Sequence, residues 1–217
     1  MKAAFRGIIK IFPAVFLMTV VTASAQNKTV VKKNNTERLQ LATEIDKSIR
    51  TELLSKWYPQ SMDSLFGGFL TTFTYNFLPT GPQDKMIVTQ ARHVWSNAIA
   101  SQLYPGVDHY KKCAAQGFDF LKNKMWDKTY GGFYTLVDRN GNVKDSTGKT
   151  AYGNAFGIYA SAAWYRASGD KNALQLAKDC FEWLEKNAHD PILKGYYQNL
   201  LPDVAPVKRT AADPSTS

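Results

Sequence analysis

The stretch DKTYGGFYT, residues 127–135, contains a pattern that occurs three times in this chain of 217 residues. The first copy, DSLFGGFLT, begins at Asp63, and the third, DPILKGYYQ, begins at Asp190. In each copy an aspartate precedes a glycine pair and an aromatic residue, except that Lys194 replaces the first glycine of the third copy. Because the copies are about 64 residues apart, the pattern indicates a repeat architecture with one helix-loop-helix unit in each period.

The segments between the motifs have apolar residues at the spacing of three and four that is typical of amphipathic helices. We expect helices over residues 36–57, 84–104, 108–126, 150–168 and 170–188. Short links join the second to the third and the fourth to the fifth, which favours antiparallel helix pairs. The sequence RNGN at 139–142 lies between β-type residues and predicts a small hairpin.

The expected helices differ in how charged residues are distributed along them. The helix over 150–168 has no charged residue between Ala151 and Tyr165, and the helix over 84–104 has few beyond its start. The other three have many charges on one face. A helix that is apolar all round is buried and an amphipathic helix faces water, so inner and outer helices should alternate. The sequence thus predicts an all-α fold in which two layers of helices form a ring, an α/α toroid.

The N-terminus has the three parts of a secretory signal peptide in the usual order. Three basic residues precede an apolar run at 11–21, and the small residues ASA at 23–25 predict cleavage before Gln26. The run is short for a membrane span, and no second long apolar run follows. We therefore predict a signal peptide at 1–25, a flexible lead-in at 26–35 and one α/α domain from residue 36 to 217. The mature protein would be periplasmic or secreted and would have no membrane association.

The charge pattern and the cysteines favour neither a nucleic-acid partner nor a metal site. The formal net charge is +9, yet basic residues are scattered among acidic ones and only 28–35 is locally basic. A nucleic-acid-binding surface would concentrate them on one face, so no nucleic-acid partner is expected. Cys113 and Cys180 lie in apolar helical patterns and favour buried thiols, although an exported protein could join them. No Cys/His spacing predicts a metal site.

Two runs resemble the N-acylglucosamine 2-epimerase family, which includes cellobiose and mannobiose 2-epimerases. They are KMIVTQARHVW at 85–95 and GGFYTLVDRNGNVKDSTGKTAYGNAFGIYASAAWYRASGD at 131–170, and the resemblance extends from about residue 37 to residue 201. It implies an (α/α)6 barrel and a small-molecule sugar or disaccharide substrate. It also implies proton abstraction at C2 of the opened reducing-end sugar, an enediolate intermediate, and two histidines as acid and base, with no cofactor.

The resemblance assigns two pocket residues and suggests two more. Arg92 matches the family's arginine in an Arg-x-x-aromatic pattern, where it would hold sugar oxygens and stabilise charge on the enediolate. Tyr152 matches the tyrosine of a Lys-x-x-Tyr pattern. Trp95 and Phe156 are further candidates because sugars stack on aromatic rings. Without the resemblance, a snorkelling or ion-paired arginine and an aromatic stripe packed in the core would explain the same pattern.

The three histidines of the chain do not match the family's catalytic pair. His93 adjoins Arg92 but points to another side of its helix, His109 begins an outer helix, and His189 ends one. The resemblance places the acid and base beyond Ser217, and six helix pairs would need roughly 400 residues. We therefore expect this chain to be the N-terminal half of a longer enzyme and to be inactive alone, with the apolar sides of its inner helices exposed.

Two other functions are compatible with the sequence. A glycoside hydrolase or lyase with the same toroid would need two carboxylates, and Asp63, Asp127 and Asp190 are candidates. Their equivalent positions in the repeat favour a structural role in the loops instead. A non-catalytic carbohydrate-binding domain would bind without turnover and would cover its open side by dimerising. The sequence leaves the oligomeric state and the sugar open, although export favours oligosaccharides.

Overall fold

The computed structural model describes residues 34–144 and 148–201, which fall into two compact units divided after Ser55. In the first unit residues 34–48 are α-helical and η1 (Ile49–Leu54) is π-helical. A short helix, α2 (Ser55–Trp57), lies at the boundary. The helix expected over 36–57 is therefore present, with a π-helical stretch that the sequence pattern did not indicate. The predicted signal peptide and most of the predicted lead-in lie outside the described residues.

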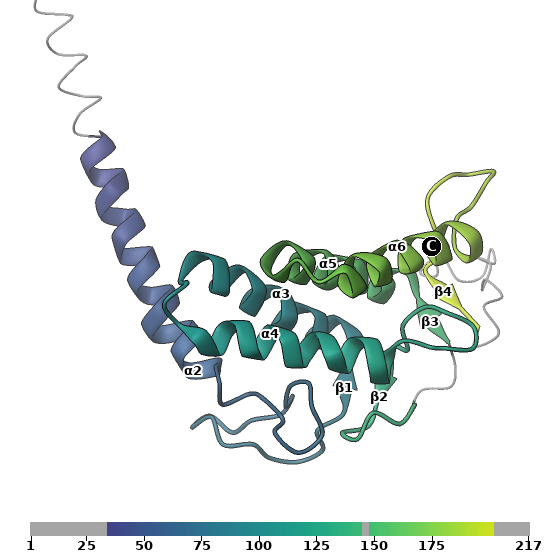
Figure 1. Ribbon diagram of the computed structural model, residues 1–217, viewed down its shortest axis with the longest axis horizontal. Helices are drawn as coiled ribbons and strands as arrows, with labels where there is room; N and C mark the ends of the chain where they lie inside the picture. Colours follow the sequence, from purple (N-terminus) through teal and green to yellow (C-terminus); the bar gives the residue numbers. More distant parts are fainter. Residues whose placement is uncertain (1–33, 145–147, 202–217) are drawn as a thin grey trace, which may run out of the picture. The chain divides into compact units, whose positions relative to one another are not determined.

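The second unit contains the remaining helices, shown in Figure 1. They are α3 (Ile87–Leu103), α4 (Asp108–Phe120), η2 (Leu121–Met125), α5 (Ala151–Ser168) and α6 (Lys171–Asn187). The starts of α5 and α6 follow from their caps, because Thr150 Oγ1 accepts a hydrogen bond from Gly153 N and Asp170 Oδ1 accepts one from Asn172 N. The expected helices over 108–126, 150–168 and 170–188 are confirmed, with η2 forming the end of the first.

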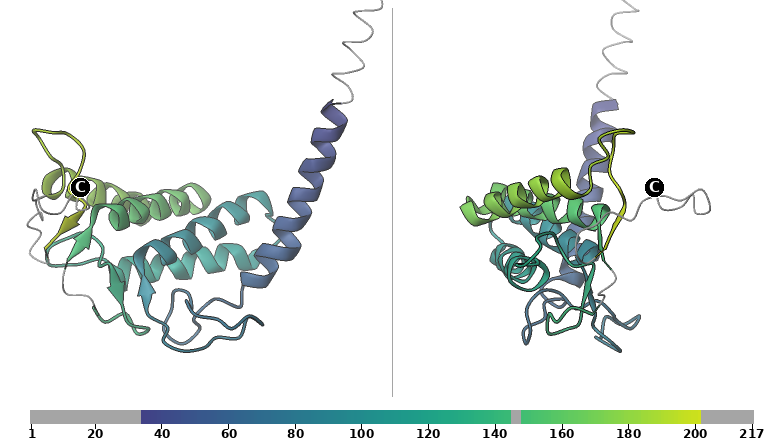
Figure 2. Two further views of the ribbon diagram at one scale, coloured as in Figure 1. Left: turned by 180° about the vertical axis from the view of Figure 1, so that it is seen from behind. Right: turned by 90° about the vertical axis from the view of Figure 1, so that its right-hand side faces the viewer.

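The helices of this unit form two layers (Figures 1 and 2). α3 and α5 lie side by side, α4 packs on α3, and α6 packs on α5. This is the predicted alternation of inner helices (α3, α5) and outer helices (α4, α6), so the all-α class and the α/α layering are confirmed. No helix among the described residues is long and apolar enough to cross a membrane.

The aromatic residue that ends each of the first two motifs fills the core between the layers. Phe69 and Phe133 are both fully buried. A Cβ on Gly117 of α4 would lie 2.4 Å from the Phe69 ring, and a Cβ on Gly157 of α5 would lie 2.2 Å from the Phe133 ring. The absence of a side chain at these two glycines is what allows the loop aromatics to reach the interior.

The helix expected over 84–104 begins later than predicted, at Ile87. Residues 84–86 are not helical: Lys85–Met86 form strand β1, which pairs antiparallel with β2 (Leu136–Val137). The same arrangement recurs where β3 (Lys149–Thr150) pairs with β4 (Asn199–Leu200). In both repeats the strand before the inner helix contains a buried lysine, Lys85 or Lys149. The hairpin around 139–142 is confirmed by a single bridge, Val137 with Val143, and a bond from Asp138 N to Asn142 O.

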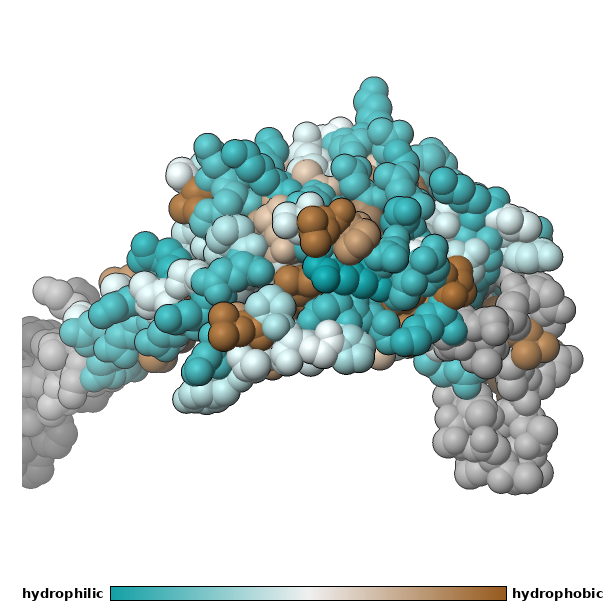
Figure 3. Space-filling model, turned by 90° about the horizontal axis from the view of Figure 1, so that it is seen from below, coloured by the Kyte–Doolittle hydropathy of each residue, from teal (hydrophilic) through white to brown (hydrophobic). Residues whose placement is uncertain are grey.

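The helix over 150–168 is not buried all round, in agreement with the expectation that the apolar sides of the inner helices are exposed in this chain. Tyr152 is 51% exposed and Tyr159 is 40% exposed, because this face of α5 lines an open cavity rather than a packed layer. The opposite face, with Ala160 and Trp164, is buried. The face of the molecule seen in Figure 3 is mainly hydrophilic, and its hydrophobic residues form small separate patches.

The aspartates of the repeated motif have structural roles, as the repeat predicted. Asp63 and Asp127 are buried, and each accepts two hydrogen bonds from backbone amides two and three residues further along. Each also pairs with the lysine of the following strand: Lys85 Nζ lies 3.0 Å from Asp63 Oδ2, and Lys149 Nζ lies 2.6 Å from Asp127 Oδ2. The ion pair thus fixes the loop to the start of the inner helix.

The first ion pair has a further member. Arg139, on the hairpin of the second repeat, donates from Nε to Asp63 Oδ2 at 2.8 Å and from Nη2 to Asp63 Oδ1 at 3.1 Å. Burial of Asp63 opposes its ionisation, but the hydrogen bonds from Arg139 and Lys85 outweigh it and lower the pKa of Asp63 to about 2. The contact connects consecutive repeats through a charged group.

Both cysteines are buried and unpaired. Burial raises the pKa of the Cys113 thiol to about 12 and also raises that of Cys180. The interpretation of these residues as small core thiols, rather than as a disulfide, is confirmed.

Candidate functional site

An open cavity of about 670 Å³ lies along the face that α3 and α5 share. All four residues that the sequence suggested for a pocket contribute to it. The lining comprises Arg92, Trp95 and Ser96 from α3 and Tyr152, Ala155, Phe156 and Tyr159 from α5. Residues three and four apart share one face of a helix, so two helices side by side bring these separate runs of sequence together.

Arg92 forms the polar centre of the cavity. Its Nη2 donates a long hydrogen bond of 3.4 Å to Tyr152 Oη, and its Cζ lies 4.9 Å from the centre of the Phe156 ring. No carboxylate in the described part of the chain lies within ion-pair distance of it. The guanidinium is therefore held in place by a hydroxyl and a ring and keeps its charge for an incoming group.

Aromatic rings form the rest of the wall. Trp95 and Tyr159 stack with their centroids 5.1 Å apart and an interplanar angle of 15°. Phe156 makes edge contacts with Tyr152 at 4.9 Å and Tyr159 at 5.8 Å. Burial raises the pKa of Tyr159, and the charge of Arg92 opposes that rise. These rings offer apolar faces beside a single cation, which suits a neutral ligand with hydroxyl groups.

Sequence reasoning identified four of the seven lining residues as site candidates. Tyr159 was missed as a candidate because an aromatic stripe at helical spacing is typical of a core. Its spacing from Tyr152 and Phe156 was the available signal. Ser96 and Ala155 carry no chemistry that a sequence pattern could have singled out.

None of the three histidines lines this cavity. His93 packs on the other side of α3, where its ring stacks on Phe69 at 4.6 Å and its Nδ1 lies 2.8 Å from Tyr58 Oη. His109 and His189 lie at the start of α4 and just after α6. The expectation that His93 points away from Arg92 is confirmed. The residues described here contain no group of three or more potential metal ligands.

Acid should destabilise the protein through His93. Burial lowers the pKa of His93 to about 4, below the value near 6.5 expected in the unfolded chain. The unfolded state therefore binds more protons between these values, and stability is full above pH 6.5 and falls as the pH drops towards 4. Urea denaturation at a series of pH values measures this slope. It should shrink in His93→Phe, and an unchanged slope in that variant would contradict the assignment.

Comparison with known proteins identifies the class. The model of the N-acylglucosamine 2-epimerase (GlcNAc 2-epimerase) family matches residues 68–213, a range that contains every residue of the cavity. The chain belongs to this family. The resemblance noted from residues 85–95 and 131–170 is thereby confirmed, and so is its partial extent.

Particular relatives are cellobiose 2-epimerases. The chain is 36% identical over 152 residues to one from Ruminococcus albus, which covers 69% of this chain and 38% of the relative. The solved structure of cellobiose 2-epimerase from Spirochaeta thermophila superposes with a TM-score of 0.71 at 32% identity and covers 79% of this chain and 42% of that one. The chain thus spans about two fifths of the length of these relatives.

A glycoside hydrolase structure is also similar to this chain, but only in its fold. A family 76 glycoside hydrolase from a bovine Bacteroides thetaiotaomicron strain superposes with a TM-score of 0.59 at 20% identity. It shares the α/α arrangement of helices.

Proposed function

We propose that this chain supplies the sugar-binding wall of a carbohydrate 2-epimerase. The observation that supports the proposal is the placement of Arg92 against Tyr152 and Phe156 in an open aromatic cavity. The relatives named above are cellobiose 2-epimerases, so we propose a disaccharide with a reducing end as the substrate class. The reaction would invert C2 by removal and return of a proton through an enediolate.

Arg92 would act on the charge that develops during this reaction. Removal of the C2 proton from the opened sugar places negative charge on the C1 oxygen, and a guanidinium with available N–H groups stabilises such charge without reorganising. Tyr152 holds the guanidinium through its hydroxyl and can itself bond a sugar oxygen. The rings of Phe156 and Trp95 would pack against the C–H faces of the sugar.

Proton transfer requires groups that this cavity does not contain. The polar groups of the lining described above are one guanidinium, two phenols, one indole N–H and one serine hydroxyl, and the lining includes no imidazole or carboxylate. We propose that the acid and base, a pair of histidines as the resemblance implies, are not among the three histidines of this chain. On this account the 217-residue chain alone binds sugar without epimerising it.

The hydrolase alternative has less support from the geometry. Asp63 and Asp127 are each paired with a buried lysine, and no carboxylate lines the cavity between α3 and α5. Asp190 accepts hydrogen bonds from the backbone amides of Ile192 and Leu193, as the other two accept theirs. These contacts suit structural loops, and the described residues place no pair of carboxylates in the cavity, as hydrolysis of a glycosidic bond would need.

The place of action is part of the same proposal. Residues 1–25 have the features of a signal peptide, so we propose an exported, periplasmic or secreted, enzyme. Oligosaccharides are a more suitable substrate there than cytoplasmic amino sugars.

Product analysis tests this function. Cellobiose is incubated with the product of the complete gene and, separately, with the purified 217-residue chain, and the sugars are identified by NMR. We expect the C2 epimer of cellobiose from the complete product and none from the 217-residue chain. Release of glucose would support the hydrolase alternative, and epimer formed by the 217-residue chain would show that its own residues include the acid and base.

A further inference from the structure

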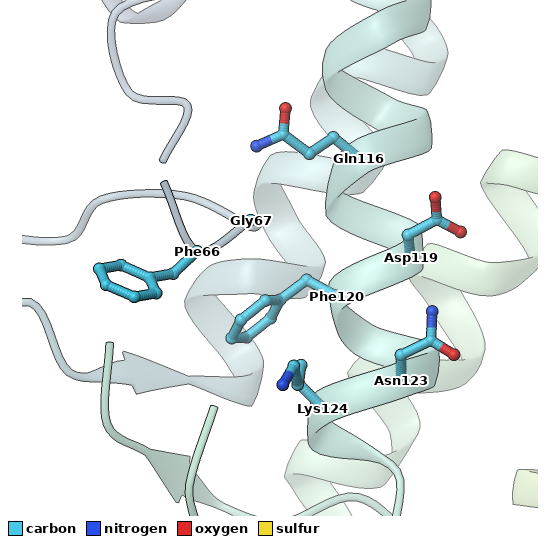
Figure 4. A pocket seen from close by; sticks show the side chains of 7 residues that line it. All are labelled: Phe66, Gly67, Gln116, Asp119, Phe120, Asn123 and Lys124. Atoms are coloured by element: carbon cyan, nitrogen blue, oxygen red, sulfur yellow. The ribbon is translucent and has the colours of Figure 1, made fainter. Parts of the chain in front are cut away.

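A second cavity lies on the outer side of the helix layers, away from Arg92. It has a volume of about 370 Å³ and lies between the loop of the first motif and the surface of α4 and η2. Figure 4 shows Phe66 on the loop with Gln116, Phe120 and Lys124 projecting toward it from the helix, while Asp119 and Asn123 lie further round the helix. Its lining is Phe66, Gly67, Gln116, Asp119, Phe120, Asn123 and Lys124.

Comparison of the two repeats explains why this cavity exists. In the second repeat the glycine pair packs against Trp183 of α6, whose Nε1 donates a 2.9 Å hydrogen bond to Tyr130 O. In the first repeat the glycine pair packs against Phe120 of α4 in the same way. Phe120 has a smaller ring and no N–H, so it cannot make the corresponding bond to the carbonyl oxygen of Phe66. The first repeat therefore has unfilled space where the second has part of an indole.

The lining has the chemistry of a site for neutral hydroxyl groups. Asp119 and Lys124 have opposite charges, so the cavity does not favour binding of an ion of either sign. Asn123 offers both hydrogen-bond donors and acceptors. These polar residues are exposed. The Phe66 ring is 43% exposed and has the Arg139 guanidinium over it at 5.3 Å, which fixes it as a platform. A cavity of this size accommodates a sugar ring.

The loop side of the cavity is built rigidly. Gln116 Nε2 donates to Asp63 O at 2.9 Å and so anchors the loop to α4. Lys85 Nζ also holds the loop, because it donates a hydrogen bond of 2.6 Å to Gly67 O. Binding here would not need to order the loop, which lowers the entropic cost for a ligand.

We propose that this outer cavity is a second carbohydrate-binding site, which takes a neutral sugar ring of an oligosaccharide. A ligand hydroxyl would replace the Trp183 N–H as donor to the carbonyl of Phe66, and Asp119 and Asn123 would bond further hydroxyls. The site uses the outer helix and shares no residue with the Arg92 cavity, so it does not depend on the catalytic proposal.

The Phe120→Trp variant tests the site by filling the cavity with an indole ring, as Trp183 does in the second repeat. The probe is methyl β-cellobioside, whose blocked anomeric carbon prevents ring opening, and binding to ¹⁵N-labelled protein is followed by NMR. We expect shifts at the amides of α4 and η2 in the wild type. In Phe120→Trp the affinity at these amides should be lower by about tenfold or more, because hydrogen bonds to hydroxyls are lost with the space. In Arg92→Ala the shifts at α4 and η2 should persist.

Asp119→Ala is the second variant, because Asp119 is exposed and its removal should leave the fold intact. It should weaken binding at the same amides. This test does not depend on whether Phe120→Trp folds. No shift at α4 and η2 at millimolar probe, or equal affinity in Asp119→Ala and wild type, would overturn the proposal. Shifts confined to α3 and α5 would do the same while leaving the Arg92 site supported.

Discussion

The Asp127→Ala variant is expected to have a free energy of unfolding about 3–5 kcal/mol lower than the wild type. The substitution leaves Lys149 buried without a partner: its side chain is 2% exposed, and its Nζ lies 2.6 Å from Asp127 Oδ2. The same carboxylate accepts hydrogen bonds from the amides of Thr129 and Tyr130, and these are lost too. Urea denaturation of the purified protein measures the difference.

A double variant tests whether the loss of stability comes from leaving the Lys149 charge unpaired. Asp127→Asn together with Lys149→Met removes both charges, and most of the lost stability should return, because a buried ion pair can be replaced by groups of similar volume. An Asp127→Ala protein as stable as the wild type, with turnover of sugar abolished in the complete product, would contradict the structural role. It would instead identify Asp127 as a general acid.

The Arg92→Ala variant of the complete gene product is expected to lose roughly 10²–10³ in kcat, the usual effect of removing a donor that stabilises developing negative charge. Arg92 is exposed and has no ion pair among the described residues, so the stability should change by less than about 0.5 kcal/mol. The rate of C2-epimer formation and the thermal midpoint are measured on the same preparations.

Lysine at this position is the matched control. Arg92→Lys keeps the charge but loses the planar group that contacts Tyr152 and Phe156, so its kcat should lie between those of Arg92→Ala and the wild type. Equal rates in all three proteins would show that Arg92 has no part in the reaction. A loss of rate that only parallels a loss of folded protein would show a structural role instead.

The helices and their layering could be predicted because two strong signals agree. The motif period located the loops, and the contrast between the uncharged run after Thr150 and the charged run after Asp170 separated inner from outer helices. The cavity followed from spacing, since Arg92 and Trp95 share a face of α3 and Tyr152 and Phe156 share a face of α5. Their roles in binding sugar remain a prediction.

Other features depend on tertiary contacts that no local pattern contains. Lys85 and Lys149 belong to polar runs that suit the start of a helix. In the structure each lies in a strand, where it is buried and bonds an aspartate 22 residues earlier in the sequence. The outer cavity depends on a single difference, Phe120 against Trp183, which has meaning only once both rings are seen to cover equivalent glycines.

Solvent exchange at C2 tests the central claim most directly. The complete gene product is incubated with cellobiose in D₂O, and incorporation of deuterium is located by NMR. Proton abstraction beside Arg92 through an enediolate predicts deuterium at C2 of the reducing-end sugar in both epimers, at a rate that falls with Arg92→Ala. Epimer that forms without deuterium at C2, or exchange that is unaffected by Arg92→Ala, would contradict the account.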